Sequence, residues 1–181
     1  MRFTFNIKLN DQDYLDYNVF WMLRSPYGKK QMVKFRISIT VIFALACFFI
    51  LFNGGFSRNS VIALIPCLIL FAVIQALLNI YFIRVLKKQL TDHKKTGKMG
   101  YSPIAEMEFE EDKFIEITPN NKTEQAYTAV ERISIVDNKT IYIHVNTVMA
   151  YILPMSCFES QTQCEAFLAF MKTKCNVIDR Y

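Results

Sequence analysis

The chain has 181 residues, of which 52% are hydrophobic, and it carries a formal net charge of +5. The hydrophobic residues gather in two stretches without any charged side chain, residues 37–57 and 59–83. Two such stretches in a chain of this length exclude a soluble single-domain protein, a disordered chain and a fibrous protein.

Charge is divided between the two halves of the chain. Residues 1–98 carry a net charge of +10, whereas residues 99–181 carry a net charge of −5. An acidic C-terminal domain would be repelled by nucleic-acid phosphates and by anionic lipid head groups. We therefore expect no nucleic-acid partner and no specific binding of anionic lipid head groups by this domain.

The two apolar stretches predict a transmembrane hairpin. Residues 37–56 and 61–83 are each long enough to cross the hydrocarbon core as a helix, and the loop between them is rich in turn formers. Gln75 and Asn79 lie four residues apart and therefore share one helix face. They could contact a ligand or a second hairpin, or form hydrogen bonds within this hairpin.

Basic residues flank the hairpin on one side. Eleven Lys and Arg residues lie close to the outer ends of the spans, within residues 24–36 and 84–98, against Arg58 alone in the loop between the spans. The residues nearest the spans are Lys29, Lys30, Lys34, Arg36, Arg84, Lys87 and Lys88. This asymmetry predicts a two-span protein of the cell membrane with both termini in the cytoplasm.

The N-terminal segment, residues 1–36, predicts a strand and a juxtamembrane helix. Apolar and polar residues alternate over residues 3–9, as in a half-buried strand. Residues 14–23 follow as a short helix, with Asn10 or Asp11 as its N-cap. Its aromatic residues suit either the membrane interface or packing on the C-terminal domain. We expect the strand to complete the C-terminal sheet, because its apolar face and backbone groups need partners.

The C-terminal part predicts a basic linker and a small domain. Residues 84–103 form the linker, and residues 104–181 contain consecutive short strands followed by an amphipathic helix that Ser160 and Gln163 cap. The expected strands are residues 105–109, 114–118, 125–129, 133–136, 140–145 and 148–153. Strands joined by tight turns favour antiparallel pairing. The predicted fold class is membrane α+β: a two-helix hairpin and a small antiparallel sheet or partial barrel capped by a helix.

No motif indicates catalysis or a cofactor. Nucleotide-binding loops, nucleophile elbows and zinc-ligand spacings are absent from the sequence. His93 and His144 have no partner at a recognisable spacing, and we interpret both as surface residues. The acidic row that begins at Glu106 fits the wet face of a strand better than a metal site. We expect no enzyme, no metal and no cofactor, and the five cysteines suit buried thiols in a reducing compartment.

The ending of the chain resembles a known family. Ile152, Leu153 and Pro154 precede Phe158 and a Ser-capped helix, an arrangement similar to that of the bacterial YcxB-like membrane proteins. The resemblance extends to the N-terminal strand, the two spans and the C-terminal domain. It implies a pleckstrin-homology-like domain, a curled sheet closed at one end by its last helix, and no defined activity.

Three functions agree with these features. The first is a non-enzymatic membrane protein that presents a small cytoplasmic domain to a protein partner or to a second copy of itself. The second is self-immunity against a membrane-active peptide or toxin, which neighbouring toxin genes would favour. The third is binding of lipid or a small ligand between the spans, through Gln75 and Asn79.

Overall fold

The chain folds into two compact units. The computed structural model describes residues 2–55, 57–97, 99–147 and 149–181. One unit, the helical hairpin, comprises Val19–Gln89. The other combines Met1–Asn18 with Leu90–Tyr181, and we call it the β-domain. The hairpin is thus inserted between two parts of one domain.

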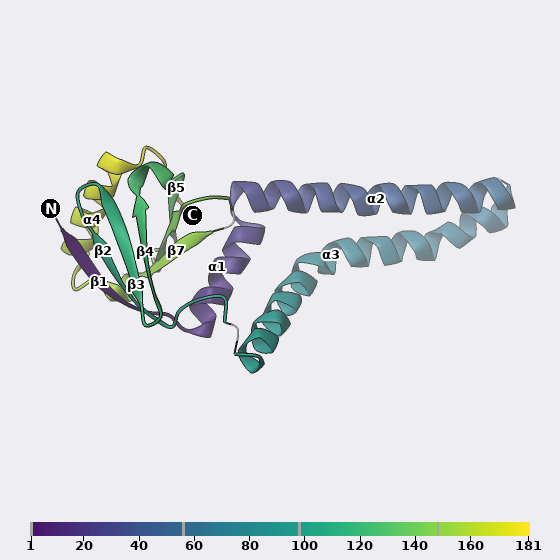
Figure 1. Ribbon diagram of the computed structural model, residues 1–181. Coiled ribbons are helices and arrows are strands. Elements are labelled where there is room, and N and C mark those ends of the chain that lie inside the picture. Colours follow the sequence, from purple (N-terminus) through teal and green to yellow (C-terminus); the bar gives the residue numbers. More distant parts are fainter. Residues whose placement is uncertain (1, 56, 98, 148) are drawn as a thin grey trace. The chain divides into compact units, whose positions relative to one another are not determined.

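Two long apolar helices form the hairpin, as the sequence predicts. Helix α2 (Pro26–Gly54) begins with a proline at its first turn, and the side chain of Ser25 accepts a hydrogen bond of 3.0 Å from the Gly28 amide. Helix α3 (Arg58–Lys95) lies beside it (Figure 1). The Phe43 ring lies 4.4 Å from that of Phe71, and the Phe35 ring lies 5.4 Å from that of Phe82. Because the earlier residue of α2 meets the later residue of α3, the two helices run antiparallel.

Helix α3 is longer than the predicted span. It continues to Lys95, so the first part of the expected linker, residues 84–103, is helical. No Gly or Pro occurs between residue 83 and Gly97, so nothing in this part of the sequence breaks the helix. Gly97 adopts a positive φ of 67°. Because basic side chains favour the C-terminal end of a helix, Lys94 and Lys95 in the last turn stabilise this extension.

The β-domain contains two four-stranded sheets, and Figure 1 shows how they are arranged. The first has the order β1-β2-β3-β4 and the second the order β7-β6-β5-β8. The strands are β1 (Phe3–Lys8), β2 (Ile104–Phe109), β3 (Lys113–Thr118), β4 (Asn121–Ala126), β5 (Arg132–Val136), β6 (Thr140–His144), β7 (Ala150–Pro154) and β8 (Ile178–Arg180). The pairs are antiparallel except for β5 with β8. The predicted α+β class is confirmed.

Strand β1 joins the first sheet at its edge. It pairs antiparallel with β2, and Phe5 lies opposite Met107 although the whole hairpin separates them in the sequence. The alternation read from residues 3–9 matches the observed burial, because Phe5 and Ile7 are buried and Thr4 and Asn6 are exposed. The prediction that this strand completes the C-terminal sheet is confirmed.

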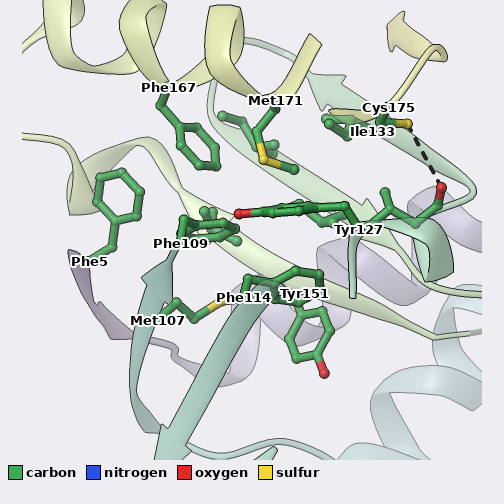
Figure 2. Close-up of a cluster of buried hydrophobic side chains, with 14 of the residues drawn as sticks. Phe5, Met107, Phe109, Phe114, Tyr127, Ile133, Tyr151, Phe167, Met171 and Cys175 are labelled. Carbon is green, nitrogen blue, oxygen red and sulfur yellow. Dashed lines mark hydrogen bonds between the residues drawn. The ribbon is translucent and has the colours of Figure 1, made fainter. Parts of the chain in front are cut away.

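The core of the β-domain is rich in aromatic rings (Figure 2). Helix α4 (Gln161–Lys174) places Phe167 and Met171 on it, and both are fully buried. The Phe167 ring meets those of Phe5 and Phe109 at 5.1 and 4.8 Å. The predicted cap is present, since the Gln163 amide donates to the Ser160 hydroxyl at 3.1 Å. Helix α4 thus closes the core with one apolar face.

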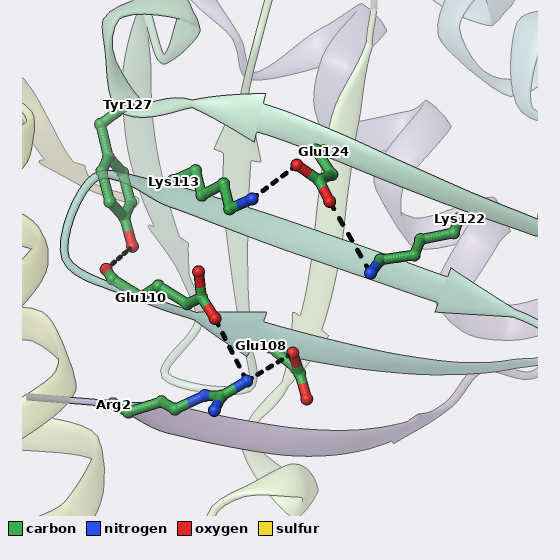
Figure 3. A network of polar contacts seen from close by, with 7 residues as sticks. All are labelled: Arg2, Glu108, Glu110, Lys113, Lys122, Glu124 and Tyr127. Atoms are coloured by element: carbon green, nitrogen blue, oxygen red, sulfur yellow. Dashed lines mark hydrogen bonds and ion pairs between the residues drawn. The ribbon is translucent and has the colours of Figure 1, made fainter.

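The acidic row lies on the outer face of the first sheet (Figure 3). Arg2 pairs with Glu108 at 2.8 Å and with Glu110 at 3.2 Å, and Lys113 pairs with Glu124 at 2.6 Å. These groups are partly exposed, so each pair contributes little stability. This placement agrees with the interpretation of the acidic row as the solvent-exposed face of a strand.

Two expectations about the strands are wrong. The strand expected at residues 125–129 is β4, which ends at Ala126, and Tyr127–Ala129 forms a 3₁₀ turn. His144 is fully buried rather than on the surface. Its side chain does lie on the face of β6 that is turned away from the core, whereas the neighbouring Ile143 faces the core. Helix α1 (Asp11–Leu23) covers the face of His144, and the Tyr17 ring centroid is 6.4 Å from that of the His144 ring.

Candidate functional site

The basic flanks lie at the open end of the hairpin. Lys29, Lys30 and Lys34 are exposed near the start of α2, and Arg84, Lys87 and Lys88 are exposed near the end of α3. Arg36 is half-buried, and its guanidinium donates a hydrogen bond of 3.1 Å to the Asn79 side-chain oxygen. Asn79, one of the two polar residues predicted within the spans, therefore forms a hydrogen bond with a basic flanking residue of the same hairpin.

Gln75 lies on the face of α3 that is turned toward α2. It is half-buried, one helical turn before Asn79, and its side-chain nitrogen is buried without a hydrogen-bond partner among the described residues. An amide nitrogen in an apolar environment is costly to leave unpaired. The two polar residues thus share a face, as predicted, but they differ in their contacts.

A cavity of about 460 Å³ opens in the β-domain beside β7, an edge strand of the second sheet. Residues from both sheets, from the first turns of α1 and from the segment before β2 line it. They are Ile7, Leu9, Tyr14, Tyr17, Met99, Gly100, Tyr101, Ser102, Ala105, Met107, Glu116, Thr118, Met149, Ala150, Tyr151 and Ile152. Small-molecule sites in proteins have this size and mostly apolar lining.

Two polar groups reach the cavity from the strands. Glu116 lies opposite Met107 in the β2–β3 pair, so it faces the core side of the sheet, and burial raises the pKa of its carboxyl. Tyr151 is 5% exposed, and burial followed by the charge of Glu116 raises the pKa of its phenol. Sequence reasoning missed Glu116, because Ile115 and Ile117 beside it suggest the opposite orientation of the strand.

A polar clamp holds the segment before β2 on the start of α1. The Tyr101 hydroxyl donates to Asp11 at 2.7 Å, and the Lys94 ammonium pairs with the same carboxylate at 2.6 Å. Hydrogen bonds from Lys94 and Tyr101 lower the pKa of Asp11. The Tyr14 and Tyr101 rings stack with centroids 4.9 Å apart. These contacts fix two aromatic rings at the cavity wall.

The first half of α1 packs on strands of the β-domain, which is one of the two placements considered for this helix. Its N-cap is Asn10, whose side-chain oxygen accepts from the amides of Gln12 at 2.8 Å and Asp13 at 3.0 Å. Tyr17 packs on Tyr142 with ring centroids 5.2 Å apart. The sequence predicts this helix and its cap but not the surface that it covers.

Comparison with known proteins gives one match, which lies in the β-domain. No curated protein and no solved structure matches the chain. A family model described as YcxB-like protein matches residues 109–171, from the end of β2 into α4. The match includes Glu116 and Tyr151 of the cavity. Over these residues the chain matches the YcxB-like protein family, which confirms the resemblance predicted from the sequence for this part of the chain.

Proposed function

We propose that this chain is a two-span membrane protein that presents its β-domain at the cytoplasmic face as a non-enzymatic binding module. The observation that carries the proposal is the exposure of the hairpin. Its two helices contain apolar segments with mean hydropathies of 2.4 and 2.8. Only 0% and 6% of the residues in these segments are buried. A core helix of a soluble protein would be mostly buried, so this surface fits lipid as its partner.

Two further features support the orientation. The basic flanks lie at the end of the hairpin where the chain enters and leaves it, and Arg58 is the single basic residue of the connecting loop. Strands β1 and β2 stand on either side of the hairpin in the sequence and pair with each other. This pairing supports a topology in which both ends of the hairpin lie on the same side of the membrane.

Reporter fusions test the topology. A reporter active only outside the cytoplasm is expected to be silent when fused after Tyr181 and active when inserted between Gly54 and Gly55. A reporter that is active only in the cytoplasm serves as the matched control and should give the opposite pattern. Activity of the first reporter at Tyr181 would show that the proposed orientation is wrong.

Lipid binding by the hairpin is a second candidate function, favoured by a groove near its open end. The groove measures about 370 Å³ and is lined mainly by apolar side chains, with one ammonium group at Lys34. The lining residues are Trp21, Met22, Gly28, Gln31, Met32, Lys34, Phe35, Ser38 and Phe82. Aromatic and basic residues of this kind suit the membrane interface, where an acyl chain can lie on the rings and a phosphate near Lys34.

Exchange of Lys34 tests the lipid candidate. Lys34→Gln is expected to weaken binding of phosphatidylglycerol about fivefold, since one basic residue near an anionic surface is worth about 1 kcal/mol. Native mass spectrometry of the purified protein measures the bound lipid. Lys30→Gln, an exposed lysine of the same helix outside the groove, is the matched control. Equal losses in both variants would indicate general charge attraction and contradict a site in the groove.

A further inference from the structure

The β-domain cavity has one acidic side chain among the described residues that line it. Glu116 supplies a carboxyl, and no Lys, Arg or His occurs among the described residues that line the cavity. The adjoining turns of α1 add Asp13 and Asp16, whose charges raise the pKa of Tyr142 after the larger effect of burial. Arg132 acts in the opposite sense, since burial raises the pKa of Tyr17 and the charge of Arg132 lowers it. The preference for a positive charge therefore rests on the lining itself, which has one carboxyl and no basic side chain among the described residues.

The walls suit a cation that also has an apolar body. Four tyrosine rings, those of Tyr14, Tyr17, Tyr101 and Tyr151, line the cavity. Aromatic faces attract ammonium groups, most strongly where water is excluded. Met107 is buried in the wall, whereas Met99 and Met149 are 40% and 45% exposed. Methionine side chains adapt to ligands of irregular shape, so these two residues can accommodate an apolar group at the rim.

The Tyr151 hydroxyl is a second polar group for a ligand. Its oxygen is buried, which raises the phenol pKa, and the Glu116 carboxyl and the Gln125 side chain are the polar groups that also act on this pKa. In Figure 2 this hydroxyl points away from the cluster formed by Phe109 and Phe167. A phenol oxygen has two lone pairs, so it can accept a hydrogen bond from a ligand that carries an N–H group.

We propose that the cavity binds a small organic cation with an apolar body, with its ammonium group at Glu116 and Tyr151 and its body against the methionines. The inference names the ligand class of the binding module proposed above, but it does not depend on the orientation in the membrane. The reporter fusions test that orientation and the binding experiment below tests the cavity, so the two proposals fail separately.

Isothermal titration of the full chain in nanodiscs of zwitterionic lipid tests the proposal. The probes are 2-phenylethylamine, which is an ammonium ion at pH 7, and 2-phenylethanol, its neutral counterpart, with empty nanodiscs as the blank. We expect the amine to bind at least tenfold more tightly than the alcohol. Equal affinities, or no binding of the amine at millimolar concentration, would overturn the proposal without any need for a variant.

Two substitutions locate the bound amine. Glu116→Gln is expected to lower the affinity for 2-phenylethylamine at least tenfold, and Tyr151→Phe should weaken it to a smaller extent. Glu106→Gln removes a carboxylate from the opposite face of the same sheet and should leave the affinity unchanged. Thermal unfolding checks that each variant is folded. Amine binding that survives both cavity substitutions would place the ligand elsewhere and refute the assignment.

Discussion

Replacing Phe5 by alanine is expected to lower the unfolding free energy of the β-domain by about 3–5 kcal/mol. Phe5 is 1% exposed, and its ring lies 4.7 Å from that of Phe158 and 5.1 Å from that of Phe167. The loss combines the transfer free energy of the ring with the cavity that it leaves. The effect reaches the C-terminal helix, because β1 connects that helix to the first sheet.

Pulse proteolysis in increasing urea measures this loss on the full chain in nanodiscs, where the hairpin stays in lipid. Asn6→Ala changes the neighbouring, exposed position of the same strand and is expected to change the free energy by no more than about 0.5 kcal/mol. If Phe5→Ala costs no more than Asn6→Ala, β1 does not contribute to the core.

A fall in pH is expected to destabilise the β-domain through His144. Burial, followed by the charge of Arg132, lowers the pKa of this histidine from 6.5 to about 4. Because the folded-state pKa lies below the unfolded value, the unfolded chain binds the proton more readily as the pH falls from about 6.5 to about 4. Stability is therefore lost across this window, by about 3 kcal/mol in total.

The pH dependence is read as a difference between variants. Glu116 acts in the opposite direction, since its raised pKa makes the folded state bind a proton more readily as the pH falls. The unfolding free energies of wild type and His144→Gln are therefore compared between pH 7 and pH 4. We expect a flatter profile for His144→Gln than for wild type. A profile as steep in His144→Gln as in wild type would contradict the assignment.

Local patterns in the sequence are sufficient to predict much of this fold. The spans follow from length and hydropathy, and the caps at Asn10 and Ser160 follow from residue types at fixed spacing. The turn at Asp137 and Asn138 was also predictable, because Asp and Asn are residue types that tolerate positive φ. In the structure these two residues adopt φ values of 50° and 51°. Each of these features depends on residues close together in the chain.

Apart from the pairing of β1 with the C-terminal sheet, features that depend on contacts between distant residues could not be predicted from local patterns. The alternation around His144 assigns its face correctly, but only the packing of Tyr17 shows that this face is buried. Strand β8 has three residues and pairs in parallel with β5, a contact that no local pattern indicates.

The candidate site also combines features that local sequence patterns predict with features that they do not predict. Gln75 and Asn79 were predictable as a shared helix face, whereas the bond from Arg36 to Asn79 depends on how the two helices align. In β3, buried residues occur on both faces, since Phe114 and Ile115 are 0% and 4% exposed. The orientation of Glu116 therefore becomes clear only from its register with Met107.

The central claim is that the two ends of the chain, separated by a membrane hairpin, form one sheet on one side of the membrane. Cysteines introduced at Asn6 and Glu106, which are direct partners in the β1–β2 pair, test it by oxidation in isolated membranes. Mass spectrometry of linked peptides is expected to find a 6–106 disulfide. Cysteines at Asn6 and Glu124 are the control, since β1 and β4 are opposite edges of the sheet, about 14 Å apart. Failure of the 6–106 link, or a 6–124 link of equal yield, would contradict the account.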